Sequence, residues 1–216
     1  MTTLEAKRRR LCDQLKRRGI TDAAVLDAIL RVRREAFLPA NLVDVAYDDT
    51  ALPIEEGQSI SQPYVVALMS EALLLSPDDR VLEIGAGSGY AAAILARIAR
   101  EVYTVERHTE LARLAARHLR DEGCENVHVA HGDGTLGWPD HAPYNAIVVA
   151  AGGPDVPQPL LDQLAVGGRL VMPVGEERDQ QKLVRVTRTG AADYRREDLG
   201  DVRFVPLIGA QGWLDQ

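Results

Sequence analysis

The chain has 216 residues, and a typical domain takes roughly 100–200, so we expect one domain spanning residues 1–216. Hydrophobic residues make up 46% and charged residues 26% of the chain, a composition that excludes intrinsic disorder. The net charge is −7, but residues 1–34 hold ten of the 25 basic and four of the 32 acidic residues, so this segment carries +6 and the remainder −13. No aromatic residue is interleaved with these arginines to stack on bases, so we predict solvated helix faces and no nucleic-acid partner.

Cysteine usage and the hydropathy pattern limit where the protein can work. Cys12 and Cys124 are the only cysteines, and they form no CxxC or metal-ligand pattern, so we predict reduced thiols and no metal site. Residues 1–14 carry charge where a signal peptide would need an apolar stretch, and no segment approaches the roughly 18 uninterrupted apolar residues of a membrane span. We therefore expect a cytoplasmic protein without a membrane partner.

The predicted elements change character along the chain. Two helices are predicted at residues 4–18 and 22–34, and then a turn-rich loop at 37–62 that is longer than structural linkage needs. Beyond it, periodicity predicts helices at 65–75, 90–99, 109–120 and 158–165, and strands at 80–84, 101–105, 126–130, 146–150 and 169–174. Two or three later strands (182–187, 194–198, 201–205) are joined by short turns, which favour antiparallel pairing.

This order of elements predicts an α/β fold. We expect a doubly wound, mostly parallel (Rossmann-like) sheet with N-terminal helices and an antiparallel edge. Residues 1–62 would supply the N-terminal helices and an active-site loop, and residues 63–216 the α/β core.

The segment VLEIGAGSGY joins an apolar strand to a helix through Gly85, Gly87 and Gly89. Glycine lets the backbone approach a ligand closely, and the helix that follows offers free N–H groups. The spacing G-x-G-x-G differs from the dinucleotide pattern G-x-G-x-x-G. By itself the motif is one that many strand–helix turns share.

Two acidic residues sharpen this prediction. Glu106 ends the next strand, where a carboxylate can bind ribose hydroxyls, although an exposed glutamate paired with Arg107 would look the same. Asp133 lies in a Gly-Asp-Gly turn after the third strand and could accept a hydrogen bond from an adenine amino group, although such turns are common. Together with the glycines, these residues match S-adenosylmethionine-dependent methyltransferases. Enzymes that bind NAD share the first two features but use the longer glycine spacing.

Other chemistries find less support. The chain has no G-x-S-x-G elbow and no P-loop lysine, and His128 and His131 have no partner at metal-ligand spacing. In the loop before the core, Ser59 and Ser61 form the segment GQSIS. These hydroxyls could cap the helix that starts near Pro63, or they could hold a carboxylate without protonating it.

Seven segments of the chain resemble, in order, the protein-L-isoaspartate O-methyltransferase family. They are ALPIEEGQSISQPYVVALM, VLEIGAGSGY, VYTVERH, HGDGTLGW, APYNAIVVAAGGPDVPQPLLDQL, GGRLVMPVG and VRFVPL. The glycine motif is shared by many methyltransferases, whereas the GQSIS loop and the VRFVPL end are particular to this family. The resemblance covers nearly the whole chain.

The resemblance implies a seven-stranded methyltransferase sheet, with S-adenosyl-L-methionine as methyl donor and S-adenosyl-L-homocysteine as product. It also implies methylation of the free α-carboxylate of L-isoaspartyl residues in damaged proteins and peptides, which starts repair through a succinimide. The implied site residues are the following: Ser61 as catalytic residue; Ser59, Ile60, Ser61 and Val205 for substrate; and Gly85, Gly87, Ser88, Glu106, Asp133 and Gly134 for cofactor. We expect a monomer.

The chain departs from the family pattern in the loop after the fourth strand of the alternating core. Ala150-Ala151-Gly152-Gly153-Pro154 stands where the family usually has a threonine and two alanines before proline. We expect the two glycines to loosen this loop. Serine in place of threonine at Ser59 is conservative.

Three alternatives stay open at this point. The first is a nucleic-acid methyltransferase, although strand four lacks the Asn/Asp-Pro-Pro-aromatic signature. The second is a binding module with a vestigial cofactor pocket. The third is an enzyme that methylates one dedicated aspartyl peptide.

Overall fold

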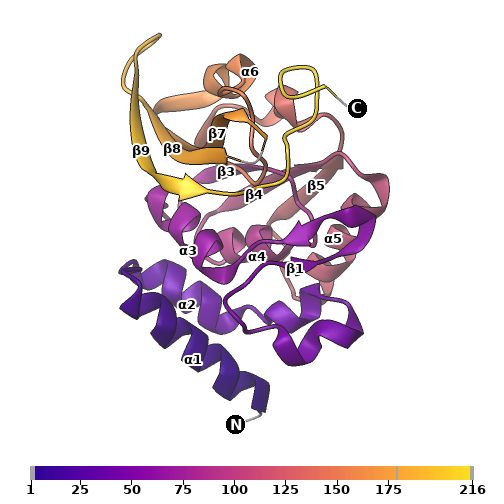
Figure 1. Ribbon diagram of the computed structural model, residues 1–216. Coiled ribbons are helices and arrows are strands. Elements are labelled where there is room, and N and C mark those ends of the chain that lie inside the picture. Colours follow the sequence, from indigo (N-terminus) through magenta and orange to yellow (C-terminus); the bar gives the residue numbers. More distant parts are fainter. Residues whose placement is uncertain (1–2, 179, 215–216) are drawn as a thin grey trace.

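The structure, a computed structural model, describes residues 3–178 and 180–214 (Figure 1). Seven strands form one sheet in the order β5-β4-β3-β6-β7-β8-β9. The pairs among β5, β4, β3, β6 and β7 are parallel, and β7, β8 and β9 pair antiparallel. The predicted doubly wound sheet with an antiparallel edge is confirmed.

The bounds of the elements are as follows. The helices are α1 (Thr3–Arg17), α2 (Ala23–Arg31), α3 (Pro63–Ala72), α4 (Tyr90–Ala96), α5 (Thr109–Asp121) and α6 (Gln158–Asp162). The strands of the large sheet are β3 (Arg80–Ile84), β4 (Glu101–Glu106), β5 (Val127–His131), β6 (Tyr144–Val149), β7 (Leu164–Glu177), β8 (Gln180–Arg188) and β9 (Tyr194–Val202). Strands β1 (Leu52–Pro53) and β2 (Ser59–Ile60) form a separate small hairpin. The 3₁₀ turns are η1 (Arg34–Phe37), η2 (Ala40–Val45), η3 (Glu55–Gly57), η4 (Gly134–Leu136) and η5 (Pro139–His141).

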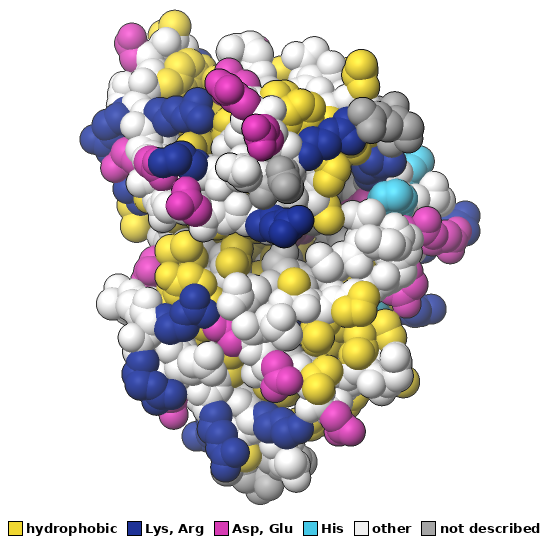
Figure 2. Space-filling model, viewed as in Figure 1, with side chains coloured by type: hydrophobic (Ala, Val, Ile, Leu, Met, Phe, Trp, Pro, Cys, Tyr) yellow, Lys and Arg dark blue, Asp and Glu magenta, His cyan; other side chains and the backbone are white. Residues whose placement is uncertain are grey.

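The N-terminal helices extend one face of the sheet by a further layer. Helix α2 packs on α3 and α4, and α1 packs on α2, so that both lie at the end of the molecule away from β8 and β9 (Figure 1). Asp22 caps α2 by accepting hydrogen bonds from the backbone N–H groups of Ala24 and Val25. The basic side chains of this segment lie over α1 and α2, at the bottom of the view in Figure 2.

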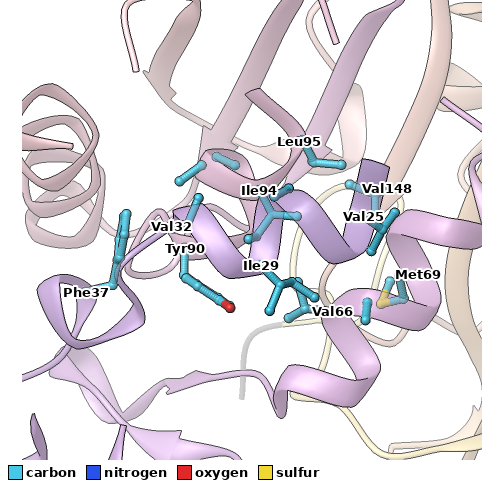
Figure 3. Close-up of a cluster of buried hydrophobic side chains, with 14 of the residues drawn as sticks. Val25, Ile29, Val32, Phe37, Val66, Met69, Tyr90, Ile94, Leu95 and Val148 are labelled. Atoms are coloured by element: carbon cyan, nitrogen blue, oxygen red, sulfur yellow. The ribbon is translucent and has the colours of Figure 1, made fainter. Parts of the chain in front are cut away.

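Alternate residues of the parallel strands point into two cores. On one face, Val81, Val102 and Val148 pack beneath the helices α1 to α5. Figure 3 shows part of this core, where side chains of α2 meet those of α3 and α4. On the other face, Leu82 and Ile147 pack with α6 and the antiparallel strands. This alternation is the one that a sheet buried on both faces requires.

The structure corrects several predicted boundaries. The second helix ends at Arg31 and is followed by η1, whereas the prediction extended it to residue 34. The predicted strands at 194–198 and 201–205 are replaced by the single strand β9, which passes through Gly200 (φ of 113°) with a shift in register against β8 and ends at Val202. The predicted loop at 37–62 begins at the last residue of η1 and holds η2, η3 and the β1–β2 hairpin.

Arg34 is fully buried and ties the N-terminal layer to the segment before the hairpin. Its Nε donates to the carbonyl oxygen of Ala46 (2.9 Å) and its Nη2 to that of Thr50 (3.4 Å). Its guanidinium lies over the ring of Tyr90, 4.8 Å from the centroid. Burial lowers the pKa of Arg34, an effect that the neighbouring Tyr90 partly offsets. The fork geometry of arginine satisfies the two carbonyl groups and the ring at once.

We expect Arg34→Lys to lower the free energy of unfolding by about 1–2 kcal/mol, because one ammonium cannot serve two carbonyl groups and stack on Tyr90. Urea unfolding followed by circular dichroism measures this change. Arg31→Lys is the matched control, since Arg31 is exposed and pairs with exposed Asp27, and it should change stability by less than about 0.5 kcal/mol. Equal effects of the two substitutions would contradict the role given to Arg34.

In the described part of the chain, no helix combines the length and apolar character that crossing a membrane requires. Cys12 and Cys124 are both buried and unpaired.

Candidate active site

A cavity of about 300 Å³ opens at the carboxyl ends of β3, β4 and β6. This is where open α/β sheets bind ligands, and the size lies at the lower end of the range of about 300–1,000 Å³ found for ligand pockets. Nine of the ten site residues predicted from the sequence line it: Ser59, Ile60, Ser61, Gly85, Gly87, Ser88, Glu106, Gly134 and Val205. The fold thus brings together residues from the hairpin, three strand ends and the C-terminal segment.

The glycine turn shapes one wall of this cavity. Gly85, Gly87 and Gly89 have φ values of 92°, 53° and 92°, a conformation that favours glycine. The N–H of Gly85 donates to the carbonyl oxygen of Val105 (2.8 Å), so the turn begins as a continuation of the sheet. Helix α4 starts at Tyr90, directly after the turn, and its first N–H groups lie beside the cavity.

Glu106 is only 4% exposed, and its carboxylate is fixed by two backbone N–H groups. The N–H of Gly87 donates to Oε2 (2.9 Å) and the N–H of His108 donates to Oε1 (3.0 Å). The exposed pair with Arg107, weighed as the alternative, does not describe this side chain. A buried, positioned carboxylate at the end of β4 suits a ligand that carries hydroxyl groups.

Asp133 is the predicted site residue that does not line the cavity. Its Oδ1 accepts hydrogen bonds from the backbone N–H (2.9 Å) and hydroxyl (2.7 Å) of Thr135, and its Oδ2 accepts one from the N–H of Ala210 (2.7 Å). Burial acts to raise the pKa of Asp133, but these hydrogen bonds outweigh it and hold the pKa below the usual 3.8. The neighbouring Gly134 lines the cavity, and a Cβ there would lie 2.4 Å from Cγ2 of Ile84.

We expect Asp133→Asn to destabilise the C-terminal segment, because the amide nitrogen that replaces one oxygen cannot accept from Ala210 or Thr135. Since the pKa of Asp133 is lowered on folding, its contribution to stability is present above pH 3.8 and is lost as the pH falls through the folded-state pKa. Thermal melts between about pH 3 and pH 7 should therefore show that the variant loses less stability on acidification than the parent. Parallel curves for the two proteins would refute this assignment.

A second cavity, of about 710 Å³, adjoins the first. The two share Ser59, Ser61, Ala150 and Val205. Beyond these residues the second cavity runs between the start of α3 and residues 199–205. The site therefore consists of two compartments, which meet at the serine loop (the GQSIS segment, residues 57–61).

The serine loop is held by the β1–β2 hairpin rather than by the helix that follows. Ile60 is buried, Ser59 is exposed and Ser61 is half-buried. Helix α3 has Gln62 at its N-cap with no side-chain cap hydrogen bond, so neither serine caps it. Instead, Nε2 of Gln62 donates to the carbonyl oxygen of Asp49 (2.8 Å), and the N–H of Tyr64 donates to the carboxylate of Asp49 (2.9 Å).

The double glycine after β6 takes part in backbone hydrogen bonds, and the loosening expected for this loop stays a prediction. The N–H of Gly152 donates to the carbonyl oxygen of Val205 (2.8 Å), and its own carbonyl oxygen accepts from the N–H of Leu207 (2.8 Å) and from Nε1 of Trp213 (3.0 Å). A Cβ at Gly152 would lie 2.8 Å from Cδ of Gln181, and one at Gly153 would lie 2.6 Å from Cε of Met172. At both positions, the space that a side chain would take is filled by side chains of β8 and β7.

Several lining residues were not predicted from the sequence. Arg107 and His108 follow Glu106 at the same sheet edge, and Ile208 continues the VRFVPL segment, whose residues were expected at the substrate. Their position next to predicted residues was the available signal. Glu56, in η3, lies with Oε2 3.8 Å from Nδ1 of His108 and has φ of 56°, a left-handed conformation unusual for glutamate.

Comparison with known proteins agrees with this geometry. A solved structure titled as a putative protein-L-isoaspartate O-methyltransferase from Plasmodium falciparum, in complex with S-adenosyl-L-homocysteine, superposes with a TM-score of 0.82 at 27% identity, over 96% of this chain and 99% of that one. A second structure, titled protein-L-isoaspartate O-methyltransferase, gives a TM-score of 0.86 at 32% identity, over 95% of this chain and 67% of that one. Fold and site define an S-adenosylmethionine-dependent methyltransferase.

Sequence relatives narrow this class to one family. The pattern of the protein-L-isoaspartate(D-aspartate) O-methyltransferase family matches residues 6–212. Protein-L-isoaspartate O-methyltransferase 2 of Pelobacter propionicus is 61% identical over 94% of this chain and 90% of its own length. The enzyme of Brucella anthropi is 49% identical over 100% of this chain and 99% of its own. The chain belongs to the protein-L-isoaspartate(D-aspartate) O-methyltransferase family.

Proposed function

We propose that this chain transfers the methyl group of S-adenosylmethionine to the free α-carboxylate of L-isoaspartyl residues in damaged proteins and peptides. The observation that carries the proposal is the pair of adjoining cavities that share Ser59, Ser61 and Val205. The first cavity suits the methyl donor, and the second is open and large enough for a peptide segment. The methyl group would then pass between them at the serine loop.

The lining of the first cavity supports a division of roles along the donor. Gly85, Gly87 and Ser88 would hold its methionine end, where the backbone of the glycine turn lies exposed to the cavity. Glu106 would bind the ribose hydroxyls through the lone pairs left on its carboxylate. Gly134 would flank the adenine, with Asp133 holding the turn from behind.

The chemistry requires little from the protein beyond positioning. The donor supplies an electrophilic methyl group on a positively charged sulfur. A carboxylate with a pKa near 4 is ionised at neutral pH, so no general base is needed. We infer that Ser61 donates a hydrogen bond to one carboxylate oxygen and that Ser59 assists, while Ile60 and Val205 keep water from the reacting groups. Excluding water favours a reaction in which opposite charges neutralise, and fixed geometry adds several kcal/mol.

The methyl ester would leave the enzyme and close to a succinimide as the next backbone amide displaces methanol. Opening of this ring returns part of the material to the normal aspartyl linkage, which is repair. We propose that residues 1–216 do this as one domain and as a monomer, without a nucleic-acid partner. We place the enzyme in the cytoplasm, in keeping with two free, buried cysteines.

The decisive experiment is methyl transfer from labelled S-adenosylmethionine to two short peptides that differ only in an isoaspartyl or an aspartyl linkage. We expect base-labile label on the isoaspartyl peptide alone. No label on either peptide, with cofactor binding intact by calorimetry, would favour the dedicated-substrate or nucleic-acid alternatives. Loss of cofactor binding would favour the vestigial pocket.

A further inference from the structure

A small cavity of about 20 Å³ lies behind the serine loop. Its polar wall consists of Ser61, Ser70 and Glu83, and the rest of the wall is apolar: Val66, Met69, Ala91, Leu95, Val148, Ala150 and Phe204. A cavity holds one water molecule once it exceeds about 10–15 Å³ and offers two to four polar partners. This cavity exceeds that volume, and Ser61, Ser70 and Glu83 are the polar residues of its wall.

Glu83 is the unusual member of this wall. It lies in the middle of β3 and is 0% exposed, opposite Thr104 in the sheet register. The hydroxyl of Thr104 donates to its Oε2 (2.5 Å), whereas its Oε1 is buried without a hydrogen-bond partner among the described residues. A buried polar atom without a partner is costly, so it points to a group that completes the site.

Burial also sets the charge of Glu83. It raises the pKa of Glu83 to about 8, against the lowering effect of the hydrogen bond from Thr104 and with a further increase from the charge of Glu106. The carboxyl group is therefore neutral at pH 7 and can donate a hydrogen bond through its O–H. No other residue in the cavity wall, from β6, α3, α4 or Phe204, carries an ionisable side chain.

We propose that Glu83, through one water molecule in this cavity, positions the hydroxyl of Ser61 for the substrate carboxylate. The proposal rests on the proposed function, since it gives Ser61 a supporting residue rather than a new reaction. Glu83 is a positioning residue, because it acts through Ser61 and the water.

The direction of the hydrogen bonds explains why a neutral acid suits this place. The protonated Glu83 donates to the water, the water donates to Oγ of Ser61, and the hydroxyl hydrogen of Ser61 is left to point at the substrate carboxylate. Each donor in such a chain strengthens the next. An ionised Glu83 could only accept, so the water would turn one of its two hydrogens toward Glu83. The acid would then no longer impose the direction of the hydrogen bond between the water and Ser61.

The test compares Glu83→Gln with Glu83→Leu. Glutamine can accept from Thr104 and donate into the cavity, as the neutral acid does, so we expect kcat on the isoaspartyl peptide within about twofold of the parent. Leucine keeps the bulk but neither accepts nor donates, and we expect kcat about tenfold lower with the Kd for S-adenosylhomocysteine unchanged. Met69→Leu is the matched control: it alters only the apolar wall and should leave kcat unchanged.

A pH profile separates positioning from a structural role. Below a pH of about 8, Glu83 is protonated in the parent, so kcat should fall as the pH rises past its pKa. The release of S-adenosylhomocysteine measures kcat across this pH range. The Glu83→Gln variant has no proton to lose and should not show this fall.

Three outcomes would overturn the proposal: equal kcat for the glutamine and leucine variants, the same fall with pH in the glutamine variant, or weaker cofactor binding that accounts for the loss in the leucine variant. If Glu83→Leu does not fold, its combination with Thr104→Val removes both partners of the buried hydrogen bond and serves in its place. A parent enzyme that leaves the isoaspartyl peptide unmethylated would instead refute the proposed function.

Discussion

Ser61→Ala is expected to lower kcat on an isoaspartyl peptide by about a hundredfold or more, while the Kd for S-adenosylhomocysteine changes less than about threefold. Because the carboxylate loses charge as it attacks, Ser61 would act by orienting it, and a misplacement of about 1 Å between reacting groups costs about a hundredfold in turnover. Ser61 lies where the two cavities meet, so its hydroxyl can reach the carboxylate without being needed to hold the methyl donor. Steady-state kinetics with calorimetry on the same preparation measures both quantities.

Ser59→Ala is the matched control for this prediction. Ser59 lies on the same hairpin and lines the same two cavities but is more exposed, so its loss should reduce kcat only a few-fold. Turnover of the Ser61→Ala variant equal to that of the parent would show that the serine does not orient the carboxylate. An equal loss of kcat for both variants would point to the hairpin as a whole.

The sequence patterns that predicted the sheet correctly are local ones, which do not depend on tertiary packing. The apolar run before Gly85 and the acid at Glu106 mark the carboxyl ends of β3 and β4, and parallel strands bring such ends to one edge. The boundaries that failed depend on tertiary packing. The helix predicted to residue 34 ends earlier because Arg34 turns inward to bind the carbonyl groups of Ala46 and Thr50, a partnership that no periodicity encodes.

The sequence predicted those site residues that belong to a recognisable motif. It did not predict residues that reach the cavity from a distant part of the chain. The C-terminal residues Leu207 and Ile208 reach the cavity because the Gly152–Gly153 backbone pairs with their segment. The sequence predicted a loosened loop there, because the conformational freedom of glycine can be inferred from the sequence, whereas the contacts around it cannot. Asp133 shows the same limit: its carboxylate accepts hydrogen bonds from Thr135 and Ala210 and does not line the cavity.

Substitution of Glu106 should have the largest effect on cofactor binding. Both of its carboxylate oxygens accept backbone hydrogen bonds, from Gly87 and from His108, and the residue lines the cavity. In Glu106→Gln, only one side-chain atom can accept, so the amide nitrogen opposes one of these N–H groups, and the charge that attracts the ribose hydroxyls is lost. Hydrogen bonds to charged groups contribute about 1.5–3 kcal/mol each. We therefore expect the Kd for S-adenosylhomocysteine to rise about a hundredfold.

Titration calorimetry measures this change, and kcat at saturating S-adenosylmethionine should fall far less than affinity does, because Glu106 acts on the bound donor rather than on the carboxylate. Glu101→Gln is the matched control: it lies at the other end of β4, where its side chain pairs with His128, and it should leave the Kd unchanged. An unaltered Kd in Glu106→Gln would remove Glu106 from the donor site. A fall in kcat without a change in Kd would place the residue with the substrate, on the other side of the serine loop.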